Sequence, residues 1–284
     1  MAVAPKNRPP RADGAKKNVV AAARAGKAPR SGGSAMRRGW EQFKSLAGAI
    51  AIFLVIRAFL VEAFRIPSSS MVPTLLVGDW LFVNKLRYGP HVPFTRVTLP
   101  GYAEPKRGDV VVFQSPHQAD EAEAGRDATP TLVKRLVAVS GDTIHMRGGL
   151  LHVNGMPQRQ GFGANANFAP GEDHPDEVFT WQNRLAVRGT RFGQPPAVPS
   201  HDNWGPLVVP KGHLWMLGDN RYCSKDSRYW GPVPRGNVRG RPLFVYYSYR
   251  AGDPSDAQCN PDYSDRPIPF ITDIRWGRIG HVIK

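Results

Sequence analysis

Three consecutive serines lie between two prolines in the first third of the chain. The stretch Pro67–Leu75 reads PSSSMVPTL. Each proline fixes its own φ and disfavours helix at the residue before it, which predicts a rigid, non-helical turn. A hydroxyl on such a turn either belongs to an ordinary polar loop or is a nucleophile held in place for acyl transfer. The composition of the stretch by itself favours the polar loop.

A serine nucleophile needs a base within hydrogen-bond reach. None of the eight histidines lies in a recognisable triad motif, which leaves lysine as the candidate base. The pKa of such a lysine must fall from about 10.4 to about 7–8, and burial among apolar groups can lower it that far.

Two lysines lie between apolar residues in runs with strand-like alternation. Lys134 shares one predicted strand face with leucines two positions away on each side, and Arg135 points to the opposite face. Lys85 follows apolar residues in the same alternation. A lysine at a sheet edge keeps its amine in solvent, so the pattern alone leaves both candidates and a surface position open.

The two cysteines, Cys223 and Cys259, form no CxxC pair, and the histidines form no HExxH motif. These patterns predict neither a metal site nor a cofactor. The cysteines can form a disulfide in an oxidising compartment, or Cys223 can pack as a small apolar group; both remain open.

Short apolar runs separated by Gly, Pro and polar turns predict a mainly β fold. Paired glycines and an Asn-Gly pair predict tight hairpins, so we expect antiparallel sheets. The predicted strands are 80–86, 110–113, 132–139, 143–146, 150–153, 214–217 and 242–249.

The formal net charge of +15 is concentrated at the N-terminus, where residues 1–40 carry ten Lys or Arg and one acidic residue. Residues 1–42 are predicted to be a disordered basic tail, since apolar periodicity is lacking. No aromatic residue precedes Trp40, so nucleic-acid binding is not expected.

Residues Ser45–Val61 contain one charge, Arg57, and would extend roughly 25 Å as a helix. A buried core helix is the alternative to a membrane span. A span is favoured because Arg57 lies near one end, where it can snorkel. We therefore predict a single transmembrane anchor at 43–64 and a β catalytic region at 65–284, with an insertion at about 157–210.

Three stretches, in order, resemble the sequence boxes of bacterial type I signal peptidases, serine proteases with a Ser/Lys dyad. The first is Pro67–Leu75, in which Ser69 replaces the usual Gly. The second is Val133–Arg135, followed by an apolar run and Gly-Asp. The third is Gly218–Gly231, in which Tyr222-Cys223 replaces the usual Asp-Asn.

This resemblance, over roughly residues 54–284, implies that Ser70 is the nucleophile and Lys134 its general base. The Ser68 hydroxyl and the Ser70 N–H would bind the oxyanion, and Ser224 would orient the lysine. Residues implied to form structural ion pairs are Asp219, Asp226, Arg228 and Arg135. Residues implied to line pockets for small side chains are Phe64, Ile66, Pro67, Met71, Leu75, Leu132 and Val133.

The resemblance also implies a membrane-bound endopeptidase that removes N-terminal signal peptides from secreted preproteins, after Ala-x-Ala sites. Its partners would be signal peptides and the lipid bilayer. It would be a single-pass protein of the cytoplasmic membrane, because the basic tail predicts a cytoplasmic N-terminus and thus an extracytoplasmic catalytic region. The sequence does not determine the oligomeric state.

Two other functions are compatible with parts of the sequence. A self-cleaving Ser/Lys repressor would need a DNA-binding region, and residues 1–40 lack a helix-turn-helix pattern. An anchored β module that binds peptides by strand addition would keep its function without Ser70 and Lys134, whereas an enzyme would not.

Overall fold

The computed structural model divides into two units, Met1–Ala49 and Ile50–Lys284. The described residues are 32–95, 97–159, 173–189, 192–252, 258–260, 262, 264 and 270–284. Residues 1–31 of the predicted tail lie outside this set, so the disorder expected there stays a prediction.

The N-terminal part of the described chain is one long helical segment. Helix α1 covers Gly32–Val55, and the π-helical turn η1 covers Ile56–Leu60. The stretch Met36–Leu60 contains an 18-residue window of mean hydropathy 2.0, none of it buried. At 25 residues, this stretch is long and apolar enough to cross a membrane.

The helical segment differs at both ends from the anchor predicted at 43–64. It begins at Gly32 and stops at Leu60, because Val61–Arg65 form strand β1. This strand pairs along its whole length with β2, Asp79–Asn84. Its backbone hydrogen bonds therefore go to a strand distant in sequence, a partner that a local hydropathy pattern does not reveal.

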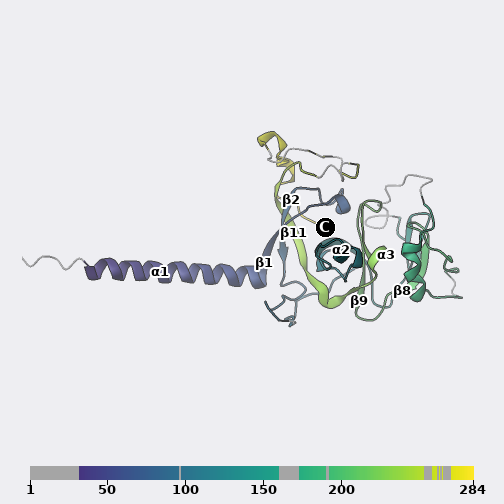
Figure 1. Ribbon diagram of the computed structural model, residues 1–284, viewed down its shortest axis with the longest axis horizontal. Coiled ribbons are helices and arrows are strands. Elements are labelled where there is room, and N and C mark those ends of the chain that lie inside the picture. The colour runs from purple at the N-terminus through teal and green to yellow at the C-terminus, as the bar shows by residue number, and fades with distance from the viewer. Residues whose placement is uncertain are drawn as a thin grey trace, which may run out of the picture. The chain divides into compact units, whose positions relative to one another are not determined.

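A seven-stranded antiparallel sheet lies in the second unit, in the order β1-β2-β11-β3-β4-β9-β10. Figure 1 labels β1, β2, β11 and β9 among its strands. Besides β1 and β2, the sheet contains β3 Val110–Gln114, β4 Thr131–Val139, β9 His213–Leu217, β10 Val233–Pro234 and β11 Val238–Ser248. Together with the second sheet, it confirms the predicted mainly β fold.

A second antiparallel sheet has four strands in the order β7-β6-β5-β8. These strands are β5 Thr143–Arg147, β6 Leu150–Val153, β7 Met156–Pro157 and β8 Trp204–Val208.

Short helical elements lie between the strands and after the last of them. The short α-helices are α2 Ala119–Glu123 and α3 Ser227–Trp230. The 3₁₀ turns are η2 Ser69–Met71, η4 Glu177–Arg184, η5 Arg235–Asn237, η7 Ile271–Asp273 and η8 Trp276–Arg278.

The predicted insertion at 157–210 contains strand β8 near its C-terminal end. Strand β8 pairs with β5 and is part of the second sheet. Trp204 and Leu207 are buried in its core. The sequence pattern does not predict this strand, because a glycine and a proline interrupt it. In the structure, a Cβ built on Gly205 would lie 2.7 Å from the carbonyl oxygen of Ile144. Glycine permits this close approach of the two strands.

The two cysteines form a disulfide, Cys223–Cys259, with a Cα–Cα distance of 5.9 Å. It joins the third box to a segment 36 residues further along the chain. The alternative of a packed free thiol at Cys223 is therefore not what the structure shows. Within the described ranges, no group of three or more His, Cys, Asp or Glu side chains is arranged to hold a metal ion.

Candidate active site

The serine stretch contains one 3₁₀ turn, η2, in place of the fully non-helical turn expected from its prolines. The flanking residues Ser68 and Val72 are extended. Each proline fixes its own φ and disfavours helix at the residue before it, Ile66 or Val72, so Ser69–Met71 remain free to turn. Met71 and Leu75 are buried in a core cluster, which anchors the turn in the sheet region.

Lys134 and Ser70 meet in the interior of the second unit. Lys134 lies on β4 opposite Val111 of β3, and its Nζ is 2.6 Å from Ser70 Oγ. The two residues are only 4% and 7% exposed. Burial lowers the pKa of Lys134 to about 8; Asp226 opposes this shift and Arg228 adds to it. A substantial fraction of this amine is therefore neutral near pH 8.

Lys85, the other lysine that the sequence left open, has different partners. Its Nζ forms an ion pair with Glu62 at 2.7 Å. It also donates to the backbone carbonyls of Arg57 and Ala58, at 3.0 and 3.3 Å. The partners of Lys85 are thus a carboxylate and two backbone carbonyls, and none of these contacts involves Ser70.

Ser224 lies close to the nucleophile, but its hydroxyl does not have the predicted partner. Its Oγ donates to Asp226 Oδ2 at 2.8 Å, and no hydrogen bond joins it to Lys134 within the described residues. A Cβ added at Gly218 would lie 2.2 Å from Ser224 Oγ and 2.5 Å from the carbonyl oxygen of Ser70. The orienting role of Ser224 toward Lys134 stays a prediction.

Arg135, the residue after the lysine, connects the three boxes. Its Nε and Nη2 donate to the two carboxylate oxygens of Asp219 at 2.7 and 2.6 Å. Thr74, in the first box, donates to the same carboxylate at 2.6 Å. Arg135 also donates to the carbonyl oxygen of Gly108 at 2.7 Å. Asp219 and Arg135 were both expected to form structural ion pairs. In the structure they pair with each other.

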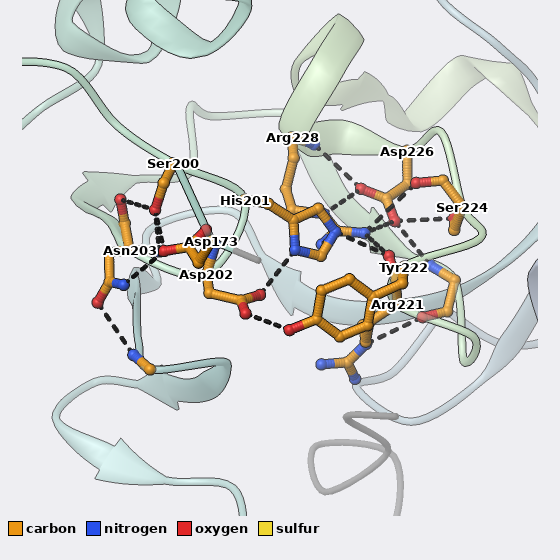
Figure 2. Close-up of polar contacts among 12 residues, drawn as sticks. Asp173, Ser200, His201, Asp202, Asn203, Arg221, Tyr222, Ser224, Asp226 and Arg228 are labelled. Carbon is orange, nitrogen blue, oxygen red and sulfur yellow. Dashed lines mark hydrogen bonds and ion pairs between the residues drawn. The ribbon is translucent and has the colours of Figure 1, made fainter. Parts of the chain in front are cut away.

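The second ion pair, Asp226–Arg228, lies inside the third box and is fully buried. Arg228 Nε and Nη2 donate to the two carboxylate oxygens at 2.9 and 2.8 Å (Figure 2). Burial alone would raise the pKa of Asp226, but Arg228, the Gly218 N–H and the Ser224 hydroxyl hold it below its usual value. Both charges are thus compensated where water is excluded.

Arg228 also belongs to a polar network that the sequence did not predict. It contacts His201 Nε2, and His201 Nδ1 lies 2.6 Å from Asp202 Oδ1. The Tyr222 hydroxyl donates to the other carboxylate oxygen of Asp202 (Figure 2). His201 and Asp202 fall in the predicted insertion, so only the unusual Tyr222 of the third box could have signalled them.

A small pocket of about 60 Å³ includes both Ser70 and Lys134. Ser68 also lines it, with its Oγ 3.4 Å from Ser70 Oγ. The predicted pocket residues found in its wall are Phe64, Ile66, Pro67, Met71, Leu132 and Val133. The pocket is thus built from the end of β1, the serine stretch and the start of β4.

Leu75 is the predicted pocket residue that lies elsewhere. It is fully buried and packs in the core cluster beneath the serine turn. Arg65 and Thr131 line the pocket and were not predicted. They flank the predicted segments directly, but their polar side chains gave no reason to place them in a pocket for small apolar groups.

The sequence matches the family described as signal peptidase, peptidase S26, over residues 39–247. The chain belongs to this family. Signal peptidase I of Pseudomonas fluorescens is 34% identical over 222 residues, covering 74% of this chain and 72% of the relative. Signal peptidase I of Aquifex aeolicus (strain VF5) is 30% identical over 269 residues, covering 84% and 97%.

Membership in the S26 signal peptidase family gives the chain its activity. It is a serine endopeptidase that acts on the signal peptides of preproteins. It is also membrane-associated, and the apolar helical stretch Met36–Leu60 is compatible with an anchor.

The buried pair of the third box yields a stability prediction. Arg228→Gln leaves the Asp226 carboxylate buried without a cation, so we expect the free energy of unfolding to fall by about 3–5 kcal/mol. Arg126→Gln, which breaks an exposed pair with Glu121, should cost less than about 1 kcal/mol. Urea unfolding of the full chain in detergent measures both, and equal losses would contradict this account.

Proposed function

We propose that Ser70 is the nucleophile and Lys134 the general base of signal-peptide cleavage. The observation that carries this proposal is the 2.6 Å contact between Lys134 Nζ and Ser70 Oγ in a buried setting. The lowered pKa of Lys134, about 8, supports it, because only the neutral amine can take the hydroxyl proton.

The reaction would proceed through an acyl-enzyme. Ser70 Oγ attacks the carbonyl carbon of the scissile peptide bond while its proton passes to Lys134 Nζ. The tetrahedral intermediate collapses as the C–N bond breaks, and the ammonium of Lys134 donates its proton to the departing amine. Lys134 then takes a proton from the water that attacks the ester, and it returns this proton to Ser70 Oγ as the ester bond breaks and the signal peptide is released.

The oxyanion of each intermediate needs donors aimed at it. The Ser70 N–H and the Ser68 hydroxyl would supply them, since Ser68 shares the pocket with the nucleophile. Asp219–Arg135 and Asp226–Arg228 would act as positioning pairs that fix β4 and the third box around the lysine.

The pocket supports a preference for small residues before the cut. It holds only about 60 Å³ and is lined largely by apolar side chains. A substrate strand lying beside Phe64–Ser68 would turn alternate side chains toward the enzyme, so the first and third residues before the cut would be read. Ala-x-Ala signals satisfy both positions.

The basic tail supports a single-pass arrangement with a cytoplasmic N-terminus. The anchor would span the cytoplasmic membrane, and the region beyond Phe64 would lie outside. The preproteins emerge on that side, with the bond to be cut near the membrane surface.

The dyad is tested by substitution. Ser70→Ala, Lys134→Ala and Lys134→Arg should each lower kcat/KM for a preprotein by about 10³-fold or more, since a guanidinium does not release its proton at any working pH. Lys85→Met is the matched control and should keep near-normal activity. If a Lys134 variant keeps normal turnover and Lys85→Met is inactive, Lys85 would be the general base instead.

The pH dependence follows from the lowered pKa of Lys134. Because the neutral amine is the active form, kcat/KM should rise about tenfold per pH unit below pH 8 and level off above it. Rates measured from pH 5 to 10 on one preprotein would show this limb. A rate that is flat between pH 6 and 9 would exclude a base with this pKa.

The pocket predicts the specificity. Replacing the alanine before the cut by Leu or Asp should lower kcat/KM by roughly 10²-fold or more, because Leu would overfill the pocket and Asp would be buried unpaired. Changing the second residue before the cut should have little effect. Equal cleavage of the Ala and Leu signals would rule out the pocket, even with Ser70 as nucleophile.

The membrane orientation has its own test. A reporter fused after Lys284 should be active outside the cytoplasm, and protease added to intact spheroplasts should digest the region beyond Phe64. Protection of that region would reverse the proposed orientation.

A further inference from the structure

A second groove, of about 760 Å³, opens beside the third box. Helix α2 forms one wall, and Tyr222–Lys225 with the end of α3 form another; Figure 1 shows α2 and α3 close together. The groove shares no lining residue with the small pocket at Ser70 and Lys134. Its volume is in the range of pockets that bind drug-sized ligands.

One residue of the groove wall, Ser224, lies near the backbone of the nucleophile. A Cβ built on Gly218 would lie 2.2 Å from Ser224 Oγ and 2.5 Å from the carbonyl oxygen of Ser70. The Asn220 N–H, from the same box, donates to the Ser70 carbonyl at 3.1 Å. A substrate with its signal peptide in the small pocket must continue beyond Ser70, and the groove offers a path for it.

We propose that this groove binds the mature side of the preprotein, that is, the first few residues after the cut, as an extended chain. The inference rests on the proposed function of Ser70 and names a second part of its substrate. The departing amine would thus belong to a segment that the enzyme holds, which orients the scissile bond.

The groove combines an apolar wall with a negative rim. Val178, Tyr229 and Trp230 supply the apolar surface. The groove's charged lining residues are two acids, Asp120 and Glu123, and one base, Lys225. Lys225 contacts Asp120 in an ion pair, whereas Glu123 has no ion pair within the described residues. The rim therefore favours neutral or basic mature residues over acidic ones.

The test uses the full chain in detergent and three substrates with one signal peptide ending in Ala-x-Ala. Two continue with six mature residues that differ only in Lys or Glu at the third. The other ends at the cut site as a methyl ester, so it has no mature side. We expect the wild type to prefer the Lys peptide by about two- to fivefold, the range of an exposed charge pair.

Glu123→Lys should reverse this preference and leave ester hydrolysis unchanged. Glu104→Lys is the matched control: Glu104 is exposed, pairs with Arg235, and does not line the groove. It should keep the wild-type preference.

Three results would overturn the groove: no preference in the wild type, the same reversal in both variants, or an equal change in ester hydrolysis with Glu123→Lys. In each of them the ester is still cleaved, so the proposed dyad stands. Failure of the wild type to cleave all three substrates would instead overturn the proposed function, and the groove with it.

Discussion

The structure depends on keeping the amine of Lys134 out of water while limiting the effect of nearby carboxylates, which favour its protonated form. Burial lowers the pKa of Lys134, and Asp226 and Asp219 raise it. Each carboxylate is held by an arginine, Arg228 and Arg135 respectively, so little of its charge is left to stabilise an ammonium. Under the proposed function, the two ion pairs would act on the chemistry as well as on the scaffold, because without the arginines the same acids would favour protonated Lys134.

The sheet explains how these groups meet. Lys134 and Arg135 are neighbours on β4, which pairs with β9 on one side and β3 on the other. The third box follows β9 directly, and the serine stretch lies between β1 and β2. The backbone hydrogen bonds of the sheet thus hold the serine stretch, β4 and the third box near one another, although they lie far apart in sequence. A lysine side chain has four rotatable bonds and would not keep its amine at the serine without this support.

The third box departs from its family at two positions, and the structure uses both. Cys223 is bridged to Cys259, and Asn220 connects the two regions again by donating to the carbonyls of Ser69 and Cys259. Tyr222 donates to Asp202, which links the box to the loop before β8. The box is held by contacts outside itself, so residues without a catalytic role fix the surroundings of Ser224.

The sequence by itself determined what local patterns encode: a mainly β fold, one apolar span, and three boxes whose resemblance implied Ser70 and Lys134 as the dyad that we propose. Only the tertiary structure decided that Lys134 is buried beside Ser70 and that Leu75 packs in the core. It also decided that Val61–Arg65 form a strand and that Ser224 donates to Asp226. The physical reason is that burial and hydrogen-bond partners arise between residues far apart in the chain. Lys134 and Lys85 have similar neighbours in sequence, and only folding gives one of them a serine and the other a glutamate.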